Sequence, residues 1–86
     1  MNKLTADQVE FLQQFVIDNF VPIHSINPKH SAYGLKQKFS RVYFYVTTEQ
    51  FICAMRNAGF MVQPIDDGNA RFNISQESPY FFRDLG

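Results

Sequence analysis

The chain has 86 residues, with eight basic and eight acidic side chains that give a formal net charge of zero. This length supports one hydrophobic core rather than two, so we expect a single domain over residues 1–86. The only cysteine is Cys53, which excludes an intrachain disulfide. No apolar run approaches the roughly 20 residues that span a bilayer, and residues 1–10 lack a signal-peptide pattern, so we expect a cytoplasmic protein with no membrane contact.

The charges are distributed unevenly along the chain. Residues 1–18 contain one basic and three acidic side chains, residues 19–65 contain five and one, and residues 66–86 contain two and four. A basic middle segment can present a surface to anions such as nucleic-acid phosphates. The alternative is that these charges only solvate helix surfaces.

A first helix is predicted over residues 6–20. Thr5 and Gln8 have the spacing of a capping box, and Pro22 prevents the helix from continuing. Apolar residues recur at helical spacing and predict the buried face. They are Val9, Phe11, Leu12, Phe15, Val16 and Phe20.

A second helix is predicted over residues 32–40, with Ser31 as its N-cap. Leu35 and Phe39 are four positions apart and should both face the core. Gly34 indicates a close approach of another backbone. The basic side chains should point away from the core: Lys36, Lys38 and Arg41.

Residues 42–46, VYFYV, combine β-branched and aromatic side chains and predict a short strand. Thr48 should cap a third helix over residues 49–58, and Gly59 should end it. The apolar face of this helix comprises Phe51, Ala54, Met55 and Ala58. The opposite face comprises Glu49, Cys53, Arg56 and Asn57.

A β-hairpin is predicted over residues 60–75. The sequence DDGN at residues 66–69 is a strong turn signal, and Ala70, Phe72 and Ile74 alternate with polar residues as in a half-buried strand. Residues 76–86 form an aromatic C-terminal tail. Its aromatic residues should pack against something, because three exposed rings would leave a large apolar surface: Tyr80, Phe81 and Phe82.

This order of elements, α-α-β-α-β-β, predicts an α+β domain that is winged helix-turn-helix-like, with three helices and a small antiparallel sheet. The strand at 42–46 would pair with the terminal hairpin. The third helix would then be the recognition helix, which enters the major groove of duplex DNA, and the hairpin would be the wing.

Three motifs strengthen this interpretation: SAYGLK, YVTTEQFICAMRNAGF and NARFNIS, which lie within residues 31–75. Together they resemble a pattern found in small, mostly uncharacterised proteins of phages and other mobile elements. The chain departs from that pattern at Thr48, where Asn is common. The resemblance implies a winged-helix-like module and a mobile-element source.

The first functional hypothesis is a phage or mobile-element regulator that binds duplex DNA, as a homodimer if two half-sites are read. Side chains of the third helix would contact bases, and basic side chains elsewhere would contact phosphates. The candidate residues are Lys36, Lys38, Arg41, Thr48, Gln50, Arg56, Asn57 and Arg71. Carboxylates oppose this hypothesis at the start of the third helix and at the wing tip: Glu49, Asp66 and Asp67.

The second hypothesis is a protein-binding module that inhibits or adapts a host protein, for example as an anti-defence inhibitor. Its candidate interface residues are Ile52, Cys53, Tyr80, Phe81 and Phe82. We expect no enzyme activity, because no catalytic constellation is present. We also expect no metal site and no cofactor, since His24, His30 and Cys53 are too few ligands for structural zinc and the glycines are isolated.

Overall fold

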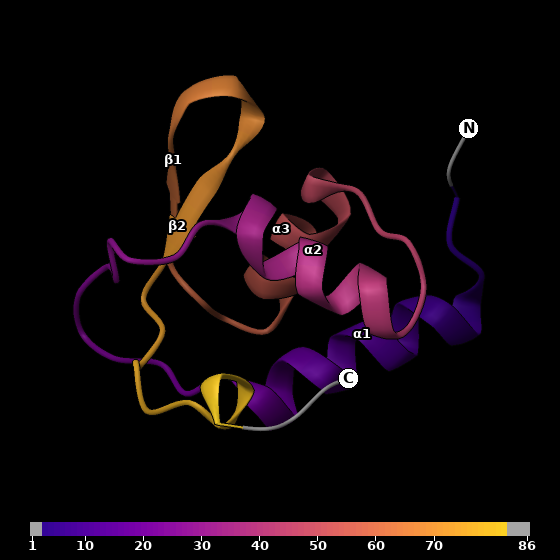
Figure 1. Ribbon diagram of the computed structural model, residues 1–86, viewed down its shortest axis with the longest axis horizontal. Coiled ribbons are helices and arrows are strands. Elements are labelled where there is room, and N and C mark those ends of the chain that lie inside the picture. The colour runs from indigo at the N-terminus through magenta and orange to yellow at the C-terminus, as the bar shows by residue number, and fades with distance from the viewer. Residues whose placement is uncertain (1–2, 83–86) are drawn as a thin grey trace.

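The computed structural model describes residues 3–82 and shows helices packed beside a two-stranded antiparallel sheet (Figure 1). The protein is therefore of the α+β class. Its elements in chain order are α1 (Ala6–Asn19), α2 (Ala32–Val42), α3 (Thr48–Asn57), β1 (Val62–Pro64), the short 3₁₀ turn η1 (Asp66–Gly68), β2 (Ala70–Phe72) and the 3₁₀ turn η2 (Pro79–Phe81). Residues 83–86 of the predicted tail lie outside the described range.

Helix α1 begins at the predicted capping box. The Gln8 amide donates to Thr5 Oγ1 at 3.1 Å, and the Thr5 amide donates to Gln8 Oε1 at 2.9 Å. Four of the predicted core residues are buried: Leu12, Phe15, Val16 and Phe20. The prediction was wrong for Val9 and Phe11, which are 49% and 44% exposed. Both lie at the borders of the apolar stripe, where α2 and α3 cover them only in part.

The predicted strand at residues 42–46 is absent, and this prediction was wrong. Helix α2 extends through Val42, and the Tyr43 amide still donates to the Phe39 carbonyl at 2.9 Å. Residues 44–47 then form an irregular connection to α3. Its backbone is held by a side chain rather than by a strand, because the Val46 amide donates to Ser40 Oγ at 3.1 Å. The β-branched and aromatic residues of 42–46 favour a strand, but no neighbouring strand pairs with them here, so the strand does not form.

Residues 21–27, rather than the predicted strand at residues 42–46, pair with the hairpin, at the end of β2 and just after it. Pro22 and Ile74 form an isolated antiparallel bridge. Three backbone hydrogen bonds continue this pairing, from Ile23 to the Asn73 carbonyl, from Asn27 to the Phe72 carbonyl and from Ser75 to the Val21 carbonyl. The connection between α1 and α2 therefore pairs with the end of β2 and the residues after it, and it bows outward between these contacts (Figure 1).

The predicted hairpin is confirmed. β1 and β2 pair with Gln63 opposite Arg71, and the turn between them contains Asp67 at φ 64° and Gly68 at φ 74°. Such left-handed conformations suit Gly and are tolerated by Asp, which explains the DDGN signal. The predicted inward-facing residues are all buried: Ala70, Phe72 and Ile74.

Helix α3 begins one residue earlier than predicted, because Thr47 rather than Thr48 is the N-cap. Only from Thr47 does Gln50 stand at the third helical position, where its side chain closes a capping box. The predicted end is confirmed: Gly59 has φ 93°, and the Phe60 amide donates to the Met55 carbonyl at 3.1 Å. This pattern is a Schellman motif.

The core lies where the three helices meet the buried side of β2. Phe39, Phe51 and Phe72, one each from α2, α3 and β2, have no exposed surface. Gly34 does not mark a close backbone approach, and that prediction was wrong. A Cβ atom at Gly34 would meet nothing nearer than Ser31 Oγ at 3.9 Å.

Candidate functional site

A groove with a volume of about 530 Å³ lies between α1 and α3. We call it the α1–α3 groove. One wall comes from α1 and the residues before it, and the other comes from the start and outer face of α3. Its lining residues are Lys3, Leu4, Val9, Leu12, Gln13, Thr47, Glu49, Gln50, Cys53, Ala54 and Asn57.

Apolar side chains form the floor and one wall of this groove. Leu12 and Ala54 are buried at its base, and Val9 is 49% exposed beside them. Gln13 joins the two helices, because its Nε2 atom donates to the Ala54 carbonyl at 2.9 Å. This hydrogen bond links the two helices at the groove, and Val9 offers accessible apolar surface there.

The rim of the groove is polar and carries both signs of charge. Lys3 lies at one side, and Glu49 and Asn57 lie along α3. The thiol-bearing residue Cys53 is exposed and lines the same groove. A concave apolar surface with a mixed polar rim can bury apolar groups of a ligand while the rim contributes hydrogen bonds.

The predicted outer face of α3 is confirmed, since all four of its members are exposed: Glu49, Cys53, Arg56 and Asn57. The predicted base-contacting residues Thr48 and Gln50 are only partly exposed. Gln50 uses its side-chain oxygen to accept a hydrogen bond from the Thr47 amide at 2.8 Å. That atom is thus committed to the helix cap.

The basic residues predicted to contact phosphate are in different surroundings. Lys36 is 4% exposed, and its Nζ atom lies 4.7 Å from the Tyr45 ring centroid and 5.2 Å from that of Tyr33. The expectation that Lys36 points away from the core was therefore wrong; its long stem covers apolar surface and its charge is held between two rings. The Nζ atom of Lys38 lies 5.1 Å from the Tyr80 ring centroid.

The remaining basic candidates are more accessible. Arg41 is exposed in the last turn of α2, and Arg71 is partly exposed on β2 opposite Gln63. Of the eight candidates, only Gln50 and Asn57 line the α1–α3 groove. Lys38 instead lines a separate hollow with Lys29 and His30.

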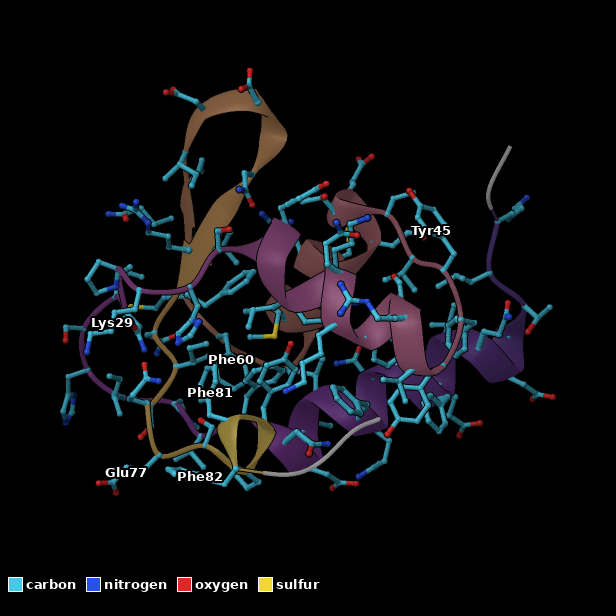
Figure 2. All side chains as sticks on the ribbon, in the orientation of Figure 1. Lys29, Tyr45, Phe60, Glu77, Phe81 and Phe82 are labelled. Atoms are coloured by element: carbon cyan, nitrogen blue, oxygen red, sulfur yellow. The ribbon has the colours of Figure 1, made fainter. Side chains whose placement is uncertain are left out.

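The predicted protein-interface residues are also divided between sites. Cys53 is exposed in the groove, whereas Ile52 is half-buried against the core. Tyr80 is 3% exposed and donates its hydroxyl to the Leu35 carbonyl at 2.9 Å, so it is a core residue. Phe81 stacks on His30 with ring centroids 4.2 Å apart, while Phe82 is 74% exposed; both lie at η2 (Figure 2).

The α1 side of the groove was missed from the sequence, because Val9 and Leu12 were both assigned to the core. The available signal was the width of the apolar stripe on α1, which exceeds what one buried face requires. Over residues 3–82, no three His, Cys, Asp or Glu side chains gather so as to hold a metal ion. Nor does any described helix have the length and hydropathy to cross a membrane. No protein-family model, curated protein or solved structure matches the chain.

Proposed function

We propose that this protein is a protein-binding module that receives a partner in the α1–α3 groove. The observation that carries the proposal is the accessible apolar surface of the groove, with Val9 49% exposed above a floor of Leu12 and Ala54. Its volume of about 530 Å³ accommodates several apolar side chains. Two helices that flank such a groove present the geometry in which an amphipathic segment of a partner is bound.

The charges near the groove favour a protein over a nucleic acid. Glu49 stands in the first turn of α3, where it would repel a phosphate that approached the helix N-terminus. The hairpin turn is likewise acidic, with Asp66 and Asp67 exposed. A chain with zero net charge also lacks the general attraction to nucleic acid that a basic protein has.

The proposed partner is a cytoplasmic host protein. This choice rests on the mobile-element source that the resemblance of residues 31–75 implies, since a product of such an element acts inside a host cell. The proposed role needs no catalytic group.

The proposal is tested by capture from host-cell lysate with two matched variants. Val9→Asp places a carboxylate on the wall of the groove. Ile17→Asp makes the same type of change on α1 at a residue that is 54% exposed and lies outside the groove. We expect one or more proteins to be retained by the wild type and by Ile17→Asp but lost with Val9→Asp.

The interaction found in this way is then measured with purified partner by calorimetry. We expect Val9→Asp to weaken binding at least tenfold, because the carboxylate would be desolvated against apolar surface. Circular dichroism and thermal unfolding establish that both variants are folded. Identical partner sets for the three proteins, or none, would refute the proposal.

Duplex DNA binding is the second candidate function. It is favoured by the succession of α2, α3 and the β1–β2 hairpin, which we interpret as a winged-helix-like arrangement with exposed Arg56 on the candidate recognition helix.

If the protein binds duplex DNA, we expect the fluorescence anisotropy of a labelled duplex to rise when the protein is added at low salt, and the affinity to fall steeply with added salt. Arg41→Ala and Arg56→Ala should each weaken it. Lys36 is unsuitable for this test, because its truncation would also remove core packing. No binding at low salt would exclude this candidate.

A further inference from the structure

The flank of α1 opposite the groove carries a cluster of aromatic rings, which we call the aromatic ridge: Phe11, Tyr43 and Phe44. The Phe11 ring centroid lies 5.1 Å from that of Tyr43 and 5.8 Å from that of Phe44. Phe11 and Tyr43 are 44% and 41% exposed. The ridge therefore joins α1 to the connection after α2 and leaves ring surface accessible to solvent.

A hollow lies on each side of the ridge, and Phe11 and Tyr43 line both. The first has a volume of about 380 Å³ and is lined also by Asp7, Gln8, Val42 and Phe44. The second has a volume of about 300 Å³ and is lined also by Gln14, Phe15, Asp18 and Asn19. Each hollow thus combines aromatic walls with one carboxylate, and no basic side chain is among its described lining residues.

The charge of α1 reinforces this pattern. The helix contains three carboxylates and no basic residue: Asp7, Glu10 and Asp18. The carboxylate at the second hollow is oriented, because Gln14 Nε2 donates to Asp18 Oδ1 at 2.9 Å.

Aromatic walls and a carboxylate together suit a cationic side chain. The face of an aromatic ring attracts a guanidinium or ammonium group, and the carboxylate forms charge-assisted hydrogen bonds with it. The apolar stem of an arginine or lysine can also lie against the rings. A neutral side chain would gain only the last of these contacts.

We propose that the aromatic ridge binds a basic segment of a partner protein, with one arginine or lysine side chain in each hollow. The inference rests on the proposed protein-binding function but uses a different surface from the α1–α3 groove. Asp7 and Asp18 are separated by roughly 16 Å along the helix axis. An extended chain spans this distance in about four to six residues, which sets the spacing of the two basic side chains.

The test uses a synthetic peptide in which three Gly or Ser residues separate two arginines. It is titrated into the ¹⁵N-labelled full chain and followed by amide chemical shifts. We expect saturable shifts at Phe11 and Tyr43 and none at Cys53. A control peptide with citrulline in place of both arginines keeps the shape but loses the charge, and it should give no shifts. Absence of shifts with the arginine peptide, or equal shifts with both peptides, would overturn the proposal.

Two variants separate a specific site from general attraction to an acidic helix. Asp18→Asn removes a carboxylate that lines a hollow, and Glu10→Gln removes one that lines neither. We expect Asp18→Asn to raise the Kd of the arginine peptide about three- to tenfold. Glu10→Gln should change it less than twofold. Equal weakening by the two variants would overturn the proposal.

The groove variant Val9→Asp distinguishes the two proposals from each other. It should leave the affinity for the arginine peptide unchanged while abolishing capture of the groove partner. If the groove partner is lost with Val9→Asp but the peptide never binds, the ridge proposal fails alone. If the peptide binds at the ridge but no partner depends on Val9, the groove proposal fails alone.

Discussion

Two segments of the chain each place three aromatic residues in a row, residues 43–45 and residues 80–82, but only the second contributes a fully enclosed core residue. Tyr80 is 3% exposed, stacks on Phe20 with ring centroids 4.7 Å apart, and donates its hydroxyl to the Leu35 carbonyl. Tyr43 and Tyr45 are 41% and 56% exposed. The segment expected to be an interaction tail supplies a core residue, and the segment expected to be a strand of the sheet lies largely at the surface.

The difference shows that covering elements, rather than aromatic content, decide burial. η2 packs across α1, where a ring can be enclosed and a carbonyl of α2 can accept the phenol hydroxyl. Residues 43–45 follow the C-terminus of α2. The rings of Tyr43 and Phe44 contact Phe11 and Phe39, but no described element covers Tyr43 and Tyr45 fully, and both remain exposed. A buried tyrosine needs a hydrogen-bond partner, and only Tyr80 has one in the core.

The largest effect should come from Tyr80→Ala. Removing the ring leaves a cavity between α1 and α2, and we expect the free energy of unfolding to fall by about 3–5 kcal/mol. The change is measured by urea denaturation. Phe82→Ala, in the same segment but at a residue that is 74% exposed, should change stability by less than about 0.5 kcal/mol. Similar losses for the two variants would contradict the contrast between these neighbours.

Tyr80→Phe should have a smaller effect, which depends on pH. The variant loses only the hydrogen bond to Leu35, worth about 1–2 kcal/mol. Burial raises the pKa of Tyr80 to about 12 from its ordinary 10.0, so the folded state holds this proton at pH values where the unfolded state releases it. The resulting stability is fully present below pH 10.0 and is lost as the pH rises toward about 12.

Urea denaturation of the wild type and Tyr80→Phe across that pH range checks the sign. The stability difference between the two proteins should shrink as the pH increases. A constant difference would show that Tyr80 does not contribute to the pH dependence.

Ser40→Ala tests how the exposed aromatic segment is held. The variant removes the hydroxyl that accepts from the Val46 amide, and we expect a loss of about 1 kcal/mol with faster hydrogen exchange at Val46. Ser25→Ala, at an exposed serine of the connection between α1 and α2, is the control. If hydrogen exchange at Val46 is unchanged, the backbone of the connection is held by something other than Ser40.

The smallest effect should come from Tyr45→Ala. This ring is 56% exposed, and its described contact is with the Lys36 ammonium at 4.7 Å. We expect a loss of about 0.5 kcal/mol in thermal or urea unfolding, as for an exposed cation–π pair. A loss as large as that of Tyr80→Ala would mean that the two aromatic segments are energetically equivalent and would break the comparison.

Local signals in the sequence predicted the helices and the hairpin well. The capping box at Thr5, the positive-φ residues of the DDGN turn and Gly59 all act within a few positions of the chain, and the structure confirms each. The pairing of residues 21–27 with the end of β2 could not be found in this way. These residues contain one proline, Pro22, and no alternating pattern, and they pair only because the end of β2 and the residues after it offer them an edge.

The candidate surfaces were predicted only in part, for a related reason. The exposed face of α3 follows from helical periodicity, so Cys53 and Asn57 could be placed at the surface from sequence. Whether Val9 is core or groove depends on how far α3 reaches over α1, which no local pattern encodes. The burial of Lys36 was missed for a different reason, because one of its ring partners, Tyr45, was predicted to lie in a strand, although Tyr33 lies only three positions earlier on α2.

The pairing of residues 21–27 with the segment after β2 also bears on how the chain is made. Asn27 bonds to the Ile74 carbonyl across 47 positions, and the Val21 amide bonds to Ser78 Oγ across 57. Contacts so distant along the chain slow the search for the native state. During translation, the connection after α1 cannot form these hydrogen bonds until residues 74–78 have been synthesised and have left the ribosome. A product truncated before residue 70 would therefore retain helical segments but lack the strand that organises them.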